Sequence, residues 1–305
     1  MNFLRTVFYG PSELRAGWRL LIFLVFFIVA SLVVVILTLL FSRHLDSIES
    51  RRIVGTLASL TSLLGAALLM AKFEGRRMSD YGLPWRQSLG KQFWQGGLLG
   101  FPTMTALIAA LHLAGVLSFT DGTPQGPLVW LYAIGYALFF VAAALFEEFS
   151  CRGYLLFTLT TGIGFWPGAV LSSLLFGLLH SANPGETLFG CFSAAVFGFL
   201  FCVMLRQTGN LWMPTGFHAA YNWGEAFFFG TPDSGQLAPQ RFLTAHFDGP
   251  QWLTGGSAGP EGSYLCVAIV VLVTIGFAFW RREAKFPDPA ALRPSPSAIL
   301  TAPAD

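Results

Sequence analysis

Eight apolar stretches, of which the fifth is short for a full span and the others are long enough to cross a lipid bilayer, constrain the fold of this chain more than any other feature. A helix needs about 20 mainly apolar residues to span the hydrocarbon core, where no water satisfies the backbone. The sequence therefore predicts an all-α polytopic membrane protein with about eight transmembrane helices. The expected spans are 18–42, 53–72, 93–119, 128–158, 166–181, 187–205, 211–230 and 263–281.

The overall composition excludes several other classes of protein. Only 11% of the residues are charged and 54% are hydrophobic, whereas soluble domains carry about a quarter charged residues. The net charge of +2 is too small to indicate binding to nucleic acid. The four cysteines lie in apolar segments without CxxC spacing, so they predict neither a disulfide framework nor a zinc knuckle.

The chain divides into three parts by composition. Residues 1–17 mix aromatic side chains with arginines, as an interfacial segment does. Residues 18–285 form the predicted membrane-embedded domain, in which the polar segment 231–262 is expected to be a long external loop. Residues 286–305 are rich in Pro and Ala, and we expect this tail to be disordered.

Lysines and arginines indicate the orientation in the membrane, because cytoplasmic loops carry an excess of them. With the N-terminus inside, the residues assigned to the inner side are Arg5, Arg15, Arg19, Lys72, Arg76, Arg77, Arg86, Lys91, Arg206, Arg281, Arg282, Lys285 and Arg293. Those assigned to the outer side are Arg43, Arg51, Arg52 and Arg241. This imbalance favours cytoplasmic termini at both ends of the chain.

Ionisable residues inside a membrane span are costly and therefore indicate function. The fourth span contains Glu147, Glu148, Cys151 and Arg152 after a long apolar run. In a helix, Glu148 and Arg152 are i,i+4 neighbours, whereas Glu147 points about 100° away and shares its face with Cys151. We expect Glu148 and Arg152 to form a structural ion pair. Glu147 is then free to face a cavity, with Cys151 as a candidate lining residue.

A histidine downstream is expected to lie at the same depth as Glu147. The turn predicted near Gly162–Gly164 lies midway in sequence between Glu147 and His180. Two antiparallel helices that leave this turn would bring both side chains to one level, because each residue adds the same rise.

The seventh span carries a second polar set on one helical stripe, formed by His218, Asn222 and Glu225. His218 lies closer to its own turn, at Gln207–Gly209, than His180 does to its turn. The predicted depth of His218 therefore differs from that of His180. We expect His218 and Asn222 to belong to the site and Glu225 to line the same cavity.

These side chains support two kinds of water activation. A glutamate in a low-dielectric pocket can act as a general base, while histidine and asparagine donors stabilise an oxyanion. Alternatively, Glu147, His180 and His218 could bind a divalent metal such as zinc that activates the water. Both schemes hydrolyse an amide within the membrane, and the sequence does not decide between them.

Residues typical of other intramembrane proteases are missing. The chain has no His-Glu-x-x-His zinc motif, and no aspartate lies inside a predicted span. The segment Gly255–Gly259 matches Gly-x-Ser-x-Gly, but it lies in a polar loop without the strand–turn–helix context of a nucleophile elbow. We interpret that match as chance.

Three motifs resemble those of the CAAX protease and bacteriocin-processing (CPBP, or Abi) family of intramembrane endopeptidases, to which the CAAX prenyl endopeptidase is related. They are Glu147-Glu148-x-x-x-Arg152-Gly153, Phe176-x-x-x-His180 and His218-x-x-x-Asn222. The resemblance implies eight helices around a cavity that opens toward the cytoplasmic leaflet. It also implies that Glu147 activates water beside His180, that His218 and Asn222 support the oxyanion, and that Glu148 and Arg152 are structural.

The resemblance leads us to expect an integral protein of a bacterial inner membrane that cleaves a peptide or a membrane-associated protein. An alternative is a membrane scaffold or chaperone-like protein that keeps the family fold without catalysis. A third class is a transporter that uses Glu147 as a proton relay. Glu147→Ala should abolish the function of a protease but not that of a scaffold. A transporter should instead show substrate flux coupled to pH.

Overall fold

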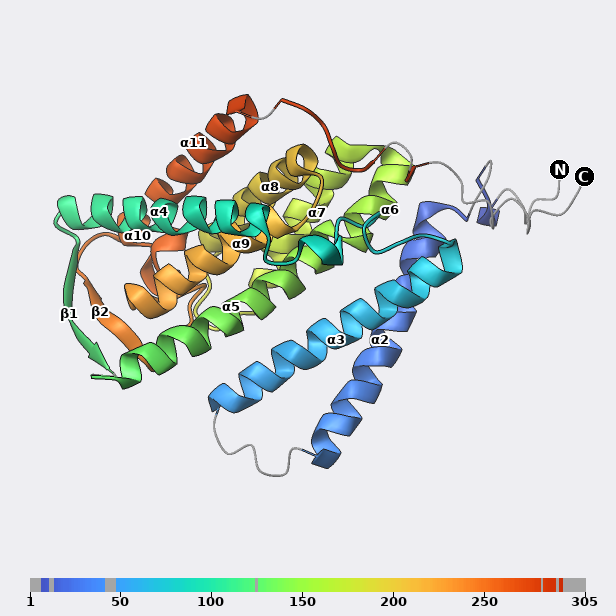
Figure 1. Cartoon of the computed structure of the whole chain (residues 1–305). Coiled ribbons are helices and arrows are strands. Elements are labelled where there is room, and N and C mark those ends of the chain that lie inside the picture. The colour runs from blue at the N-terminus through green and yellow to red at the C-terminus, as the bar shows by residue number, and fades with distance from the viewer. Residues whose placement is uncertain are drawn as a thin grey trace, which may run out of the picture.

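The computed structural model describes residues 7–10, 14–41, 48–123, 126–280, 282–288 and 291–292. Five helical stretches in this part are long and apolar enough to cross a membrane, and α7 and α11 are shorter apolar helices. The protein is thus an all-α polytopic membrane protein (Figure 1). Its main helices are α2 (Ala16–Phe41), α3 (Ile48–Glu74), α4 (Lys91–Leu113), α5 (Leu128–Arg152), α6 (Tyr154–Ile163), α7 (Phe165–His180), α8 (Leu188–Thr208), α9 (Trp212–Asn222) and α11 (Tyr264–Trp280).

Three of the predicted spans differ in detail from these helices. The span predicted at 93–119 ends early, because α4 stops at Leu113 and Gly115 turns the chain with a φ of 75°. The span predicted at 128–158 is interrupted at Gly153, which separates α5 from α6. The seventh span continues beyond α9 as a π-helix, η2 (Trp223–Phe228).

A small antiparallel sheet lies beyond the helix ends, although the sequence predicts only helices and loops there. Strand β1 (Leu117–Thr123) pairs with β2 (Arg241–Phe247), with Leu117 opposite Phe247 and Thr120 opposite Thr244. The predicted external loop 231–262 therefore contains β2. It also contains three short helical turns, α10 (Gln251–Thr254), η3 (Gly256–Ala258) and η4 (Pro260–Gly262), whereas η1 (Trp85–Gln87) precedes α4.

The helices end at two opposite faces of the bundle. We call "terminal face" the side where α2 and α4 begin and where α3, α8 and α11 end. Contacts there join Lys285 to Arg206 and Gln207 to Ala278. We call "mouth face" the side where α3, α5 and α11 begin. It carries the sheet, and the backbone of Asp248 bonds there to Val116 near the end of α4.

A buried ionic cluster fastens α2, α3 and α6 together at the terminal face. Arg19 donates to both carboxylate oxygens of Glu74, at 2.9 and 2.8 Å. The hydroxyls of Tyr81 and Tyr154 donate to the same carboxylate at 3.0 and 2.5 Å. Because every partner is buried, such a bidentate, hydrogen-bonded pair fixes the geometry of the three elements.

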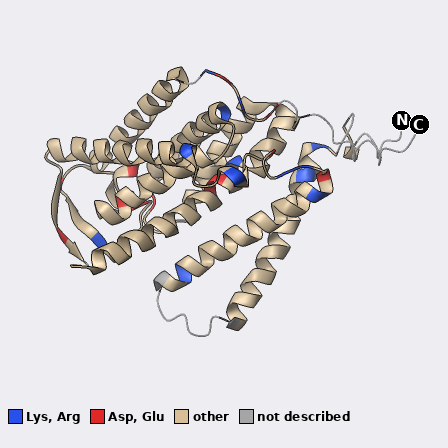
Figure 2. Cartoon of the chain, viewed as in Figure 1, with Lys and Arg blue, Asp and Glu red and all other residues tan. Residues whose placement is uncertain are grey.

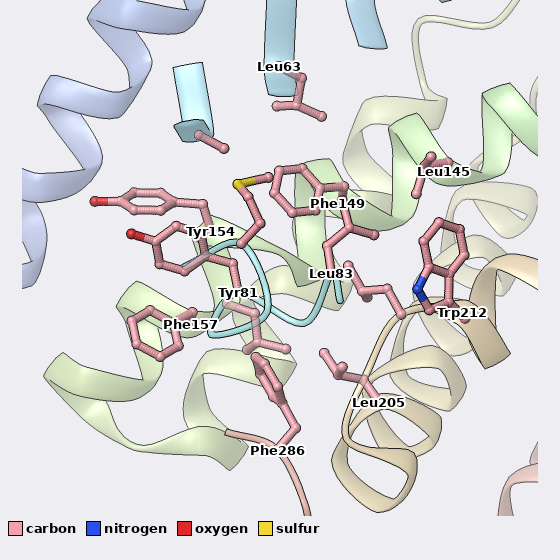
Figure 3. Close-up of a cluster of buried hydrophobic side chains, with 14 of the residues drawn as sticks. Leu63, Tyr81, Leu83, Leu145, Phe149, Tyr154, Phe157, Leu205, Trp212 and Phe286 are labelled. Atoms are coloured by element: carbon pink, nitrogen blue, oxygen red, sulfur yellow. The ribbon is translucent and has the colours of Figure 1, made fainter. Parts of the chain in front are cut away.

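A core of apolar side chains packs around Tyr81 and Tyr154 and extends to Phe149 and Leu145 of α5, as Figure 3 shows. Tyr81, Phe149, Tyr154 and Phe157 are all fully buried, and Tyr81 packs edge-on against both Tyr154 and Phe157. Trp212 at the start of α9 belongs to the same cluster. This cluster lies in the half of the bundle near the terminal face, and a second core cluster, which includes Leu111, Leu117 and Phe229, packs toward the sheet.

Both ends of the chain contain described residues that contact the bundle. Trp18 donates to the carbonyl of Val7 at 3.1 Å. The predicted disordered tail begins at Phe286, which is only 1% exposed and packs in the core, since the backbone of residues 285–286 bonds to Arg206. Residues 1–6 and 11–13 of the predicted interfacial segment, and 289–290 and 293–305 of the tail, lie outside the described part.

Helices α4 and α9 approach until their backbones touch, which glycine permits. A Cβ atom added at Gly96 would lie 2.1 Å from the carbonyl oxygen of Met213, and one at Gly100 would lie 2.1 Å from that of Phe217. Small residues four apart let two membrane helices come this close. The Gly96-x-x-x-Gly100 pair thus positions α9, which carries His218.

We predict that Gly100→Ala lowers the thermal stability of the protein, because the added methyl group forces α4 and α9 apart. Overpacking of this kind costs about 1–3 kcal/mol. Thermal unfolding of the purified protein in lipid nanodiscs measures the effect. Gly276→Ala in α11 is the matched control, since nothing lies within 4 Å of its added Cβ. Equal unfolding temperatures for the two variants would contradict the prediction.

Candidate functional site

A cavity of about 710 Å³ lies between the helices and runs from the middle of the bundle to the mouth face. Its inner end is formed by Glu147 of α5, His180 of α7 and Asn222 of α9. Its walls come from the first half of α3, the length of α5 and the loop after η2. The remaining lining residues include Arg52, Ile53, Gly55, Thr56, Ser59, Tyr132, Tyr136, Phe139, Phe140, Asn183, Asp233, Ser234 and Gln236.

The two adjacent glutamates differ in environment, as their helical positions predict. The side chain of Glu147 is 35% exposed and lines the cavity, whereas that of Glu148 is completely buried. Glu148 Oε1 lies 3.5 Å from Nη1 of the equally buried Arg152. The Arg152 guanidinium also lies over the ring of Phe176, 4.1 Å from its centroid, where a cation–π contact stabilises it.

His218 contacts both glutamates. Its Nδ1 donates to Glu148 Oε1 at 2.9 Å, and its Nε2 lies 3.7 Å from Glu147 Oε2. The second distance is too long for a direct hydrogen bond but suits a bridging water. The ring stacks on Phe201 with 5.2 Å between centroids. Phe201 fixes the plane of the His218 ring, and Glu148 keeps a proton on its Nδ1.

This position corrects the predicted difference in depth between His218 and His180. The reasoning from sequence placed the turn before α9 at the membrane boundary. In the structure that turn is buried, because the Leu211 amide donates to the Gly82 carbonyl at 2.8 Å and Trp212 packs in the core. Helix α9 therefore starts inside the bundle, and a short distance along it suffices to reach Glu147.

His180 is also held in one tautomer. Its Nδ1 lies 2.8 Å from the carbonyl oxygen of Phe176, one turn earlier in α7. Because a carbonyl only accepts, the proton is on Nδ1 and the Nε2 of the neutral ring is an acceptor. The ring lies against Phe176 and lines the cavity. His180 thus presents a proton-accepting nitrogen in the cavity that Glu147 lines.

The other residues that the sequence placed at the cavity lie elsewhere. Cys151 is 2% exposed and packs with Phe176 and Ala194, away from the cavity lining. Glu225 is completely buried in η2 and lies beside Asp233 and Glu261 instead. Cys151 shares a helix face with Glu147, and Glu225 shares one with Asn222. Each face extends beyond the cavity into a packed part of the protein, where Cys151 and Glu225 lie.

The residues suggested as zinc ligands do not form a compact metal site. Four-coordinate zinc holds its ligand atoms about 2 Å away, so any two of them lie close together. Within the described residues, the only group of three or more acidic, histidine or cysteine ligands with mutual distances below 4.8 Å is Glu225, Asp233 and Glu261. Glu147, His180 and His218 are not such a group, so we derive no chemistry through a metal bound by them.

Reasoning from the sequence missed several residues of the cavity. Asn183 follows His180 by three residues and lines the inner end, and Asp233 comes from the loop after η2. Helical spacing from His180 was the signal that could have indicated Asn183. Arg52, which ran against the expected charge distribution, lines the cavity wall. Nothing in the sequence indicated that the long loop folds back to this point.

Comparison with known protein families gives one match. A family model described as type II CAAX prenyl endopeptidase, Rce1-like, matches residues 127–224. The matched segment extends from the start of α5 to the beginning of η2 and includes Glu147, His180, His218 and Asn222. A search of curated proteins found none that matches the chain.

Proposed function

Because this chain belongs to the CAAX-type family of intramembrane proteases, we propose that it hydrolyses a peptide bond through a water activated by Glu147 and His180. The observation that carries the proposal is the inner end of the cavity. There the carboxylate of Glu147 lies beside His218, and it lines the cavity together with His180. Hydrogen bonds hold both histidine rings in fixed positions.

The proposed reaction gives each of these groups a distinct role. A water between Glu147 and His180 attacks the carbonyl carbon of the substrate, and Glu147 accepts its proton. The Asn222 amide and the Nε2–H of protonated His218 donate to the resulting oxyanion. The C–N bond then breaks, and Glu147 returns the proton to the leaving nitrogen. Glu148 takes no proton but holds His218 in position, and Arg152 balances the charge of Glu148.

The cavity indicates the class of substrate. Aromatic and small side chains line most of its length, and Arg52 contributes a positive charge from α3. This lining suits an extended apolar peptide or the end of a membrane-associated protein.

Comparison of all protein termini in cells with the wild-type chain and with Glu147→Gln tests the proposed activity. We expect new termini that depend on Glu147. Identical sets of termini would instead support the non-catalytic scaffold.

We infer that the terminal face is cytoplasmic. Lysines and arginines gather toward that end of the bundle in Figure 2. Described residues of this face are Arg15, Arg19, Lys72, Arg76, Arg77, Arg86, Lys91, Arg206, Arg282 and Lys285. Those of the mouth face are Arg51, Arg52 and Arg241. The positive-inside rule then places the mouth face outside. In a bacterium, the chain would lie in the inner membrane with its cavity open to the exterior side.

This orientation is incompatible with the cavity that the family resemblance implied, which opens toward the cytoplasmic leaflet. The cavity lining includes the first residues of α3, near Arg52, and those of α5, near Leu131. Both helices begin at the face opposite to the one where α2 begins. Cytoplasmic termini and a cytoplasmic mouth therefore exclude each other in this fold. We give more weight to the charges, so the substrates are expected to be exported peptides or outer segments of membrane proteins.

Labelling of introduced cysteines distinguishes the two orientations. Asp248 is exposed at the mouth face and Glu283 is 84% exposed at the terminal face. In intact cells, a maleimide that does not cross the inner membrane should label Asp248→Cys and leave Glu283→Cys unlabelled. The unmodified chain serves as background, since it has four cysteines of which three are buried. Labelling of Glu283→Cys alone would show that the terminal face lies outside, and the cavity would then open toward the cytoplasm.

A further inference from the structure

Three carboxylates from separate segments meet beside the cavity, and the proposed reaction uses none of them. Glu225 comes from η2, Asp233 from the loop after it, and Glu261 from η4. One carboxylate oxygen of each lies within 4.8 Å of those of the other two. Like charges at this separation repel strongly when they are partly removed from water.

Glu225 has no partner that would compensate its charge. The residue is 0% exposed, and neither of its carboxylate oxygens has a hydrogen-bond donor in the described part of the chain. Nor do the described ion pairs join any of the three carboxylates to a lysine, arginine or histidine. A buried, unpaired carboxylate is expensive unless a proton or a cation neutralises it.

The loop carboxylates are positioned around this side chain. Ser234 donates to Glu261 Oε2 at 2.9 Å, and the backbone of Asp233 and Gln236 closes a turn with two 2.9 Å hydrogen bonds. The three carboxylates therefore face one another at short distance, where a bound cation would neutralise them.

We propose that Glu225, Asp233 and Glu261 bind one divalent cation with the coordination chemistry of Ca²⁺. All three ligands are carboxylates, which hard cations prefer. Oxygens on a common Ca²⁺ lie about 2.4 Å from it and hence at most about 4.8 Å from each other, as these atoms do. Mg²⁺ demands near-ideal octahedral geometry and usually keeps several of its waters, so it is seldom bound by an all-protein set of carboxylates. Zinc prefers nitrogen and sulfur ligands.

The cation would join the long loop to the helix that carries His218. Asp233 and Ser234 line the main cavity, and Glu261 lines a small extension of it together with His218. Binding would fix the loop 231–262 against η2 and so complete the wall of the cavity at its inner end. This site is separate from Glu147, so it does not depend on the proposed reaction.

Calcium titration of the full chain in nanodiscs tests the site. After treatment with EDTA, CaCl2 up to about 10 mM should raise the unfolding temperature in a saturable way, by mass action on the folded state. One Ca²⁺ should bind per chain, as measured with ⁴⁵Ca. MgCl2 and ZnCl2 are tested in parallel, and stronger binding of either ion than of Ca²⁺ would contradict the proposed chemistry.

Glu225→Gln should abolish the calcium-dependent rise and bind no ⁴⁵Ca. In EDTA this variant should be more stable than wild type, because it removes the uncompensated carboxylate. If Glu225 had only a structural role, its replacement would instead lower the stability. Asp233→Asn provides a second variant if Glu225→Gln does not fold. Asp248→Asn, an exposed acid of the same loop, is the control and should respond like wild type. No binding by the wild type, or equal binding by Glu225→Gln, would overturn the proposal.

Discussion

Glu147→Gln is expected to lower the rate of peptide cleavage by about 10²–10⁴-fold while the protein stays folded, since general-base catalysis contributes that much. Gln keeps the shape of the side chain but cannot accept the proton of the water. The loss should appear in kcat, because Glu147 acts on the water and not on the substrate. Cleavage of a peptide identified from the comparison of termini measures the effect.

The stability of the same variant makes the prediction specific. The Glu147 side chain is 35% exposed and makes no hydrogen bond in the described part of the chain, so its replacement should leave the unfolding temperature within the error of the wild type. His180→Gln should lower activity as well, because it removes the proton-accepting Nε2. A fully active Glu147→Gln enzyme would rule out the proposed base.

Glu148→Gln is expected to have the opposite profile, with a large loss of stability. It leaves the buried Arg152 without a counter-charge, and breaking a buried ion pair by removing one partner costs about 3–5 kcal/mol. The amide oxygen of Gln can still accept from His218 Nδ1, so the part of the protein that folds should retain some activity. The unfolding temperatures of Glu147→Gln and Glu148→Gln, measured under identical conditions, test this difference.

The double variant Glu148→Gln, Arg152→Met separates charge balance from packing. Met fills much of the space of the arginine and removes the uncompensated charge, so this variant should recover stability relative to Glu148→Gln alone. Its activity should stay below that of wild type, because His218 loses the carboxylate that orients it. An unfolding temperature of Glu148→Gln equal to that of wild type would show that the pair is not structural.

Local helical geometry predicted the arrangement around Glu147 well, because it depends on contacts within one helix. The i,i+4 neighbourhood of Glu148 and Arg152, and the rotation of Glu147 by about 100° from Glu148, follow directly from 3.6 residues per turn. In the structure Glu148 is buried next to Arg152, and Glu147 lines the cavity. The all-α membrane fold was also predictable, because apolar runs of spanning length allow few other structures.

Features that depend on long-range contacts were not predictable in the same way. The depth of α9 is set by the buried turn at Leu211, which bonds to Gly82 far away in the sequence. The loop residue Asp233 reaches the cavity because Gly235 packs against the backbone of Pro184 and Gly185. Glu225 has the helical phase of a site residue, but the π-helix carries it toward the loop carboxylates. Spacing along one helix contains no information about such partners.

The uneven attachment of α3 has a consequence for the lipid environment. The ionic cluster at Glu74 and the core residues Leu63 and Met70 hold only the second half of this helix. The first half, from Arg52 to Ser59, forms one wall of the cavity and is covered otherwise by α2, whose leucines and valines are exposed to the bilayer. We therefore expect lateral pressure and bilayer thickness to change the width of the cavity. With the proposed function, we expect the lipid to influence which substrates enter the cavity.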